Sequence, residues 1–166
     1  MTQSATGYAH LPARSRPVAQ ALHAAGASGQ VRELPGSART AADAAAALGC
    51  DISAIANSLV FLADTEPLLV MASGGHRVDT AALAARVGAG ALHRATPEQV
   101  REATGQAIGG VAPLGHPAPL RTVVDTALAE HPRVWAAAGH PRTIFPTTYA
   151  ELLGITGGTA LPVNGG

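Results

Sequence analysis

The segment from Gly105 to His116 contains the residue types best suited to bind a reacting group through the main chain. Its sequence, GQAIGGVAPLGH, places four glycines and a proline among apolar residues. This composition disfavours a helix or a central strand and favours a tight loop. The adjacent Gly109 and Gly110 let a ligand approach backbone N–H groups, which can hold a carbonyl oxygen, an oxyanion or a phosphate. The spacing matches neither the dinucleotide nor the P-loop motif, so a simple turn between strands is the alternative interpretation.

Side chains that commonly carry out hydrolysis are sparse in this chain. No serine lies in a Gly-x-Ser-x-Gly motif, and the single Cys50 follows a glycine that is expected to end a helix. A lone cysteine in that place is interpreted as a small buried residue rather than a nucleophile. All 11 basic residues are arginine, which excludes lysine chemistry. The seven histidines form no close pair on one helical face, so no metal site is expected.

Two histidines and one aspartate are the polar candidates for a binding pocket. His116 and His140 each follow a glycine at a predicted strand or loop end, where a side chain can reach a pocket. Both could also be plain exposed loop residues. Asp125 ends an apolar strand, where it could accept a hydrogen bond in a cleft or cap the helix that follows.

Length, charge and composition limit the function classes. A chain of 166 residues is long enough for one domain with a sizeable core. Its 11 acidic and 11 basic residues balance, which argues against DNA binding and requires any RNA contact to be local. An aromatic content of 3% disfavours a base-stacking platform. The sequence has neither a signal peptide nor an apolar run of about 20 residues, so we expect a soluble cytoplasmic protein without membrane association.

Helical and strand patterns alternate along the chain. The connections are too short for every strand pair to be parallel with a helical crossover, so the sequence predicts an α+β fold with a mixed sheet and helices packed around it. We expect residues 1–15 to be a flexible leader, 16–156 one domain and 157–166 a tail. The predicted helices cover residues 18–25, 41–48, 52–56, 79–86, 97–105 and 147–153, and the predicted strands cover residues 31–34, 59–62, 68–71, 120–124, 134–138 and 144–145.

The order of several short motifs resembles the YbaK/EbsC family, which includes the editing domain inserted in bacterial prolyl-tRNA synthetases. The similarity extends from Pro17 to Ile155. Its motifs are residues 40–49, the segment IANSLVF at 55–61, Val78-Asp79, Thr104-Gly105, GGVAPLG at 109–115, Val124-Asp125 and Ala138-Gly139.

The resemblance implies a mixed, strongly curved sheet flanked by helices, and an aminoacyl-tRNA deacylase without metal or redox cofactor. Such an enzyme hydrolyses, in trans, the ester that joins a wrong small amino acid to the 3′ adenosine of a tRNA, often the tRNA for proline. The implied partner is a mischarged tRNA, with an aminoacyl-tRNA synthetase as a second candidate. Water attacks an activated ester in this reaction, so oxyanion donors and a pocket that positions water can suffice.

One residue departs from the family pattern. Asn57 occupies the position at which family members usually carry a lysine, and it replaces a cation with a neutral donor and acceptor. The hypothesis is that Asn57 orients the terminal ribose or the ester, and that Gly109 and Gly110 bind the oxyanion. His116 or His140 would then position water or contact phosphate.

The remaining expectations concern the substrate pocket and the alternatives. The cysteine-specific relatives tend to carry an acidic residue in the segment that reads PRTIF at 141–145 here, and the apolar Ile144 suits a small side chain. The missing lysine also favours a noncatalytic binder of a tRNA end, a nucleotide or an amino acid. Hydrolysis of another acylated small molecule is a third possibility. The predicted substrate-binding residues are Ser58, Pro113, Gly115, His116, Asp125, Gly139, His140 and Ile144.

Overall fold

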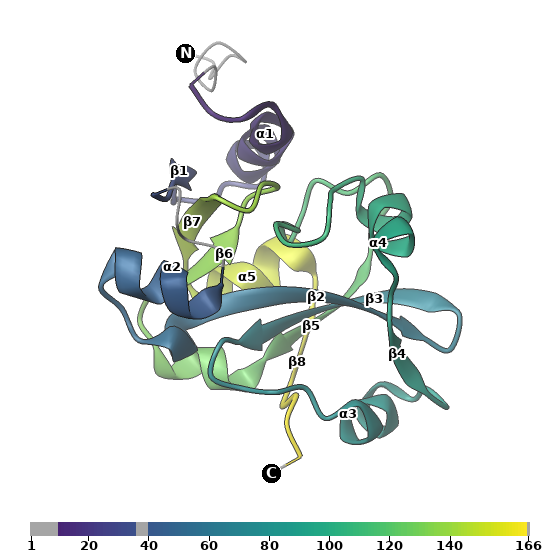
Figure 1. Ribbon diagram of the computed structural model, residues 1–166. Helices are drawn as coiled ribbons and strands as arrows, with labels where there is room; N and C mark the ends of the chain where they lie inside the picture. Colours follow the sequence, from purple (N-terminus) through teal and green to yellow (C-terminus); the bar gives the residue numbers. More distant parts are fainter. Residues whose placement is uncertain (1–9, 36–39, 166) are drawn as a thin grey trace.

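The computed structural model describes residues 10–35 and 40–165, which form a mixed sheet surrounded by helices (Figure 1). The order of the sheet is β1-β7-β6-β2-β3-β5-β8, and β4 pairs with β2 off this path. The strands are β1 (Arg32–Glu33), β2 (Ile55–Ala63), β3 (Glu66–Ser73), β4 (Leu92–Arg94), β5 (Arg121–Asp125), β6 (Val134–Ala137), β7 (Thr143–Thr147) and β8 (Thr159–Leu161).

The pairing confirms the predicted mixed sheet. Strand β2 is antiparallel to β3 and β4 and parallel to β6. Strand β5 is parallel to both β3 and β8, and β7 is antiparallel to β1 and β6. The hairpin of β2 and β3 was expected from two apolar runs, and the structure extends both strands beyond those runs.

Helix ends are set by local sequence signals. Helix α2 begins after Thr40, whose hydroxyl accepts a hydrogen bond from the Asp43 amide, and the Asp43 carboxylate accepts one from the Thr40 amide in return. It ends at Gly49, where φ is +69°. Over the described ranges the α-helices are α1 (Arg16–Ala24), α2 (Ala41–Leu48), α3 (Thr80–Val87), α4 (Pro97–Thr104) and α5 (Tyr149–Thr156), and the 3₁₀ helices are η2 (Ala13–Ser15), η3 (Ile52–Ala54) and η4 (Thr126–Glu130).

The sheet is covered on both faces. Helices α1, α4 and α5 pack against a large apolar cluster on one face, and α3 packs against a second cluster on the other (Figure 1). Helix α2 joins Ile55, Trp135 and Ile144 in a third, smaller cluster. Burial of these apolar side chains is the main contribution that holds the helices to the sheet. In the part of the chain that the structure describes, no helix has the length and apolar character needed to cross a membrane.

The region before Asn57 differs from the sequence prediction. A helix was expected over residues 52–56, but the 3₁₀ helix ends at Ala54 and β2 starts at Ile55. The reason is tertiary, because Ile55 and Ala56 pair with β6 and Ala56 also pairs with Ser73 of β3. Asn57 and Ser58 therefore lie within a strand.

Both predicted terminal segments contain residues that pack against the domain. Residues 1–9 of the expected leader lie outside the described residues, but Leu11 and Ser15 are buried. The expected tail is also corrected. Residues Thr159–Leu161 form β8 beside β5, and Val163 is buried against the α3 face. These residues carry no clear periodicity, so only their partners in the sheet and the core define them.

Candidate active site

The candidate site lies where β2 pairs with β3 on one edge and has no strand partner among the described residues on its other edge. Strand β6 pairs with β2 only at Ile55 and Ala56, and β4 pairs with it only from Phe61 onward. In a strand, successive residues direct their main-chain groups to opposite edges. The Val60 carbonyl points to the outer edge, where it accepts a hydrogen bond from the Ala95 amide at 3.1 Å. The Ser58 main-chain groups therefore point into the gap between β6 and β4.

A cavity of about 340 Å³ opens at this gap. It brings together five of the residues predicted from the sequence: Asn57, Ser58, Gly109, Gly110 and Ile144. None of the described residues that line it carries a charged side chain, so these walls consist of apolar groups, main chain, one amide and a few hydroxyls. These groups can orient an ester by hydrogen bonds.

The glycine-rich loop is held rigidly against the cavity. The Gln106 side-chain oxygen accepts a hydrogen bond from the Ala112 amide at 2.7 Å, which ties the two ends of the loop together. The Gly110 carbonyl accepts one from the Gly139 amide at 2.8 Å. A Cβ at Gly110 would lie 2.6 Å from the carbonyl carbon of His140, so only glycine fits there. The loop is thus a built wall rather than a loose turn.

Asn57 faces solvent at the cavity. Its side chain is exposed, and within the described residues its carboxamide has no hydrogen-bond partner. The neighbouring Ser58 hydroxyl is directed to the Met71 sulfur at 3.3 Å. Asn57 therefore keeps both its amide donors and its carbonyl acceptor for a ligand, and Ser58 contributes mainly main-chain groups.

Comparison with known proteins decides the family. The model of the aminoacyl-tRNA editing domain matches residues 36–155, which is more than half of the chain. The chain belongs to the aminoacyl-tRNA editing domain family. A crystal structure of a proposed trans-editing enzyme for prolyl tRNA synthetase is 43% identical, covers 94% of this chain and 99% of that chain, and superposes with a TM-score of 0.87.

Curated relatives agree with this assignment. The proline–tRNA ligase of Nitratidesulfovibrio vulgaris (strain DP4) is 31% identical over 140 residues, which are 78% of this chain and 24% of the ligase. The editing domain described here thus spans about a quarter of the ligase it matches. The uncharacterized protein YwhH of Bacillus subtilis (strain 168) is 31% identical over 123 residues, which cover 74% of this chain and 78% of YwhH. The family and the mixed fold expected from the sequence are therefore confirmed.

The editing-domain cavity does not include every predicted site residue. His116 lies in a separate hollow of about 210 Å³ together with Pro113 and Gly115. Its Nε2 donates a hydrogen bond to the Ala112 carbonyl at 2.8 Å. Burial lowers the pKa of His116, and the bond to Ala112 offsets this lowering only in part. The structure thus places His116 behind the loop as a neutral support, which corrects its expected position in the pocket.

Asp125 also lies away from the cavity. It is fully buried and accepts hydrogen bonds from the Ser73 amide, the His76 Nδ1 and the Ala127 amide, each at 3.0 Å. The bond from Ala127 caps η4, which is the alternative that the sequence left open.

The turn after β6 borders the cavity. Gly139 has a φ of +95°, and a Cβ there would lie 2.8 Å from the Arg14 carbonyl oxygen, so the turn is packed against the N-terminal segment. The Nδ1 of His140 accepts a hydrogen bond from the Arg142 amide at 3.1 Å, which leaves the proton of the neutral ring on Nε2. Pro141 lines the cavity directly. His140 is therefore the predicted histidine whose backbone adjoins the glycine loop.

Several lining residues of the editing domain were not found from the sequence. They come from α2, from the segment before it and from the strands β6 and β7. In the sequence, the small side chains on one face of the capped helix α2 could have indicated a cavity wall. The same pattern is equally typical of a helix face that packs against the core. These additional residues are Leu34, Thr40, Ala41, Ala44, Ile55, Ala56, Val111, Ala137, Pro141 and Thr143.

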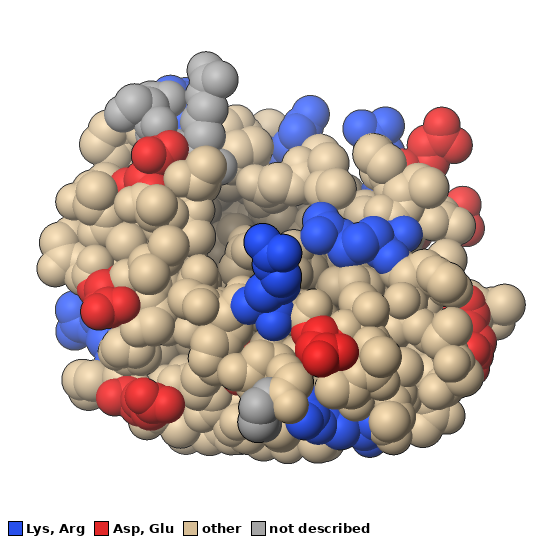
Figure 2. Space-filling model, turned by 60° about the horizontal axis from the view of Figure 1, so that its bottom comes forward, with Lys and Arg blue, Asp and Glu red and all other residues tan. Residues whose placement is uncertain are grey.

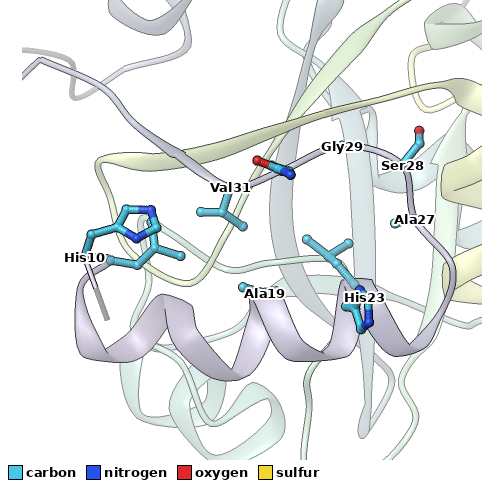
Figure 3. Close-up of a pocket in the computed structure, with 10 residues that line it drawn as sticks. His10, Ala19, His23, Ala27, Ser28, Gly29 and Val31 are labelled. Carbon is cyan, nitrogen blue, oxygen red and sulfur yellow. The ribbon is translucent and has the colours of Figure 1, made fainter. Parts of the chain in front are cut away.

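Cys50 and a cavity beside α1 lie outside the candidate site. Burial raises the pKa of the Cys50 thiol, and the nearby Asp51 raises it further, so Cys50 is a poor nucleophile. A cavity of about 280 Å³ lies beside α1, with His10 and His23 at opposite ends of the helix (Figure 3). Among the described residues, no group of three or more histidine, cysteine, aspartate or glutamate side chains is placed to hold a metal ion.

Proposed function

We propose that this chain is a free-standing aminoacyl-tRNA deacylase, which hydrolyses in trans the ester of a small amino acid attached to the wrong tRNA. The observation that carries the proposal is the cavity in which Asn57 and the Gly109–Gly110 wall meet. Its similarity over nearly the full length to a proposed trans-editing enzyme for prolyl tRNA synthetase supports this activity and makes the tRNA for proline the first candidate.

Each part of the cavity has a role in this proposal. Asn57 hydrogen-bonds to the terminal ribose or to the ester, because its carboxamide has no partner among the residues that the structure describes. The amides of Gly109 and Gly110 stabilise the oxyanion that forms when water attacks the ester carbonyl. His140, which lies in the turn beside the cavity and does not line it, positions that water through the N–H of Nε2 or contacts a phosphate. The aminoacyl side chain rests against apolar groups such as Ile144, which select by size rather than by charge.

The direct test offers purified protein a panel of tRNAs carrying alanine, serine, threonine or cysteine and follows loss of the aminoacyl group. We expect turnover well above spontaneous hydrolysis on at least one member. No turnover on any of them contradicts the proposal. Correctly charged prolyl-tRNA serves as the matched control, because a trans-editing enzyme must spare it.

A second candidate is a noncatalytic binder of a tRNA end, a nucleotide or an amino acid, which the absence of a cation at Asn57 favours. The variants Asn57→Ala and Asn57→Lys separate the two functions. For a deacylase, we expect Asn57→Ala to lower kcat by about 10-fold to 1,000-fold, the range for loss of one donor at an oxyanion or ester. For a binder, both variants change affinity for the RNA end, and neither has turnover.

A further inference from the structure

A second, smaller cavity of about 140 Å³ adjoins the first. The two share one wall, which consists of Asn57, Ser58, Gly109 and Val111. The smaller cavity is completed from α4, from the tip of the glycine-rich loop and from β4, which contributes Arg94. The two compartments thus meet at these four residues and differ in the rest of their lining.

Among the described residues that line either compartment, Arg94 is the only charged one. It lies opposite Phe61 in the pairing of β2 with β4, and its guanidinium carbon lies 5.7 Å from the centre of the Phe61 ring. This contact holds the guanidinium in place. Within the described part of the chain, the Arg94 side chain has neither a hydrogen bond nor an ion pair, so its guanidinium N–H groups are available to an anion. On the face drawn in Figure 2, arginine side chains lie beside a hollow.

Ile108 forms the apolar edge of the same compartment. It lies at the tip of the glycine-rich loop and is 47% exposed, although large aliphatic side chains are usually buried. An exposed aliphatic surface beside an arginine suits a flat base, which gains by covering apolar area and keeps its phosphate near the cation.

The covalent structure of an aminoacyl-tRNA matches these two compartments. The ester joins an uncharged aminoacyl side chain to a nucleotide that carries a phosphate, so an ester held at the shared residues can place one part in each compartment. We propose that the Arg94 compartment binds the terminal nucleotide of the RNA, with its 5′ phosphate on Arg94 and its base on Ile108. The larger cavity then receives the aminoacyl group. This inference rests on the proposed function and specifies which residues recognise the RNA end.

The test measures binding rather than turnover. The probes are two analogues of the RNA end in which a stable amide replaces the ester: 3′-alanylamino-adenosine and the same compound with a 5′ phosphate. We expect the wild-type chain to bind the phosphorylated probe about 10-fold more tightly, in line with one charge-assisted contact. Arg94→Ala should abolish this difference, Arg94→Lys should keep part of it, and Ile108→Ala should weaken both probes by about the same factor.

The control is Arg32→Ala. Arg32 also stacks on an aromatic ring, with 5.1 Å to the centre of Trp135, but it lines neither compartment, so its loss should leave the preference for phosphate unchanged. Unfolding curves of all variants check that each one folds.

The outcomes are distinguishable from those of the deacylation assay. Equal binding of the two probes by the wild-type chain, no binding of either, or a phosphate preference that survives Arg94→Ala overturns the inference, whatever the turnover. A preference that depends on Arg94 in a chain without turnover supports the nucleotide compartment and contradicts the deacylase.

Discussion

Two polar regions lie near the same part of the sheet, and they differ in whether their polar side chains are hydrogen-bonded to one another. The first is the cavity at Asn57, whose described lining residues include no charged side chain. The second, which we call the polar cluster, comprises Asp51, Ser53, His76, Asp125 and His131. The polar cluster holds the acids, bases and hydroxyls that catalysis commonly uses, yet its groups bind one another and line none of the cavities described above. The candidate site is therefore recognised by polar groups that line a cavity without a hydrogen-bond partner in the described chain. The presence of catalytic residue types does not identify it.

The Ser53–His131 contact illustrates this point. The two side chains lie 2.7 Å apart, which is the separation expected of a nucleophile and its base. However, the single hydroxyl proton of Ser53 is donated to Asp51 at 2.8 Å, so His131 Nε2 must donate to the Ser53 oxygen rather than accept from it. The bonds from Ser53 hold the pKa of Asp51 below its ordinary value, which keeps that carboxylate an acceptor. The polar cluster is therefore arranged as a structural link.

The largest expected loss of deacylation comes from a substitution in the cavity wall, Gly110→Ala. In Gly110→Ala the new Cβ would meet the backbone of His140 and Pro141 at 2.6 and 2.8 Å, so the loop must move. A displacement of this kind should lower deacylation by about 100-fold and the free energy of unfolding by about 1–3 kcal/mol. Rate assays and urea denaturation measure both.

Gly154→Ala is the matched control for this substitution. Gly154 lies within α5 with open space around it, so alanine should stabilise the chain by up to about 1 kcal/mol without changing the rate. Full deacylation activity in Gly110→Ala would show that the loop does not form the catalytic wall. It would also contradict the conclusion that the cavity, and not the polar cluster, is the active site.

The second effect concerns the polar cluster. Asp125→Ala leaves the Ser73 and Ala127 amides and the His76 ring without their acceptor. We expect a loss of about 3 kcal/mol in the free energy of unfolding, since buried donors lose their partner. Asp125→Asn should recover part of this loss. The deacylation rate per folded molecule should remain unchanged in both variants. A rate that falls by more than the loss of folded protein accounts for would assign Asp125 to the active site.

The third effect is a pH dependence of stability through His116. Because the folded-state pKa of His116 lies below its ordinary value of 6.5, the unfolded chain takes up the proton first as pH falls. The contribution of neutral His116 is therefore complete above about pH 6.5 and is lost as pH falls through the lowered folded pKa. Unfolding midpoints across pH 5–8 should decline less steeply at the acid end in His116→Gln. Identical curves would contradict this role of His116 behind the glycine loop.

The smallest effect should come from Ser53→Ala. It removes the hydroxyl that links Asp51 to His131, but both bonds lie at or near the surface, where solvent replaces them readily. We expect deacylation to stay within about twofold of the wild-type rate and the midpoint of unfolding to shift less than in Asp125→Ala. A loss of deacylation comparable to that of Asn57→Ala would mean that the polar cluster, and not the cavity alone, serves the chemistry.

Local signals in the sequence accounted for much of the fold. The capping residues Thr40 and Thr96 and the glycines that follow α2 and α4 located those helices, because caps act within one turn. The paired apolar runs located the β2–β3 hairpin. Strand β4 and strand β8 were missed, because strands of three residues have too little pattern to read without their partners.

The sequence by itself determined the family, the mixed fold, and five residues that meet at one cavity: Asn57, Ser58, Gly109, Gly110 and Ile144. Only the tertiary structure decided that His116 and Asp125 lie elsewhere, and that Arg94 borders the cavity wall. The physical reason is that motifs and caps are local in the chain. Whether a polar group is free depends on partners far away in sequence, such as the 52 residues that separate Ser73 from Asp125.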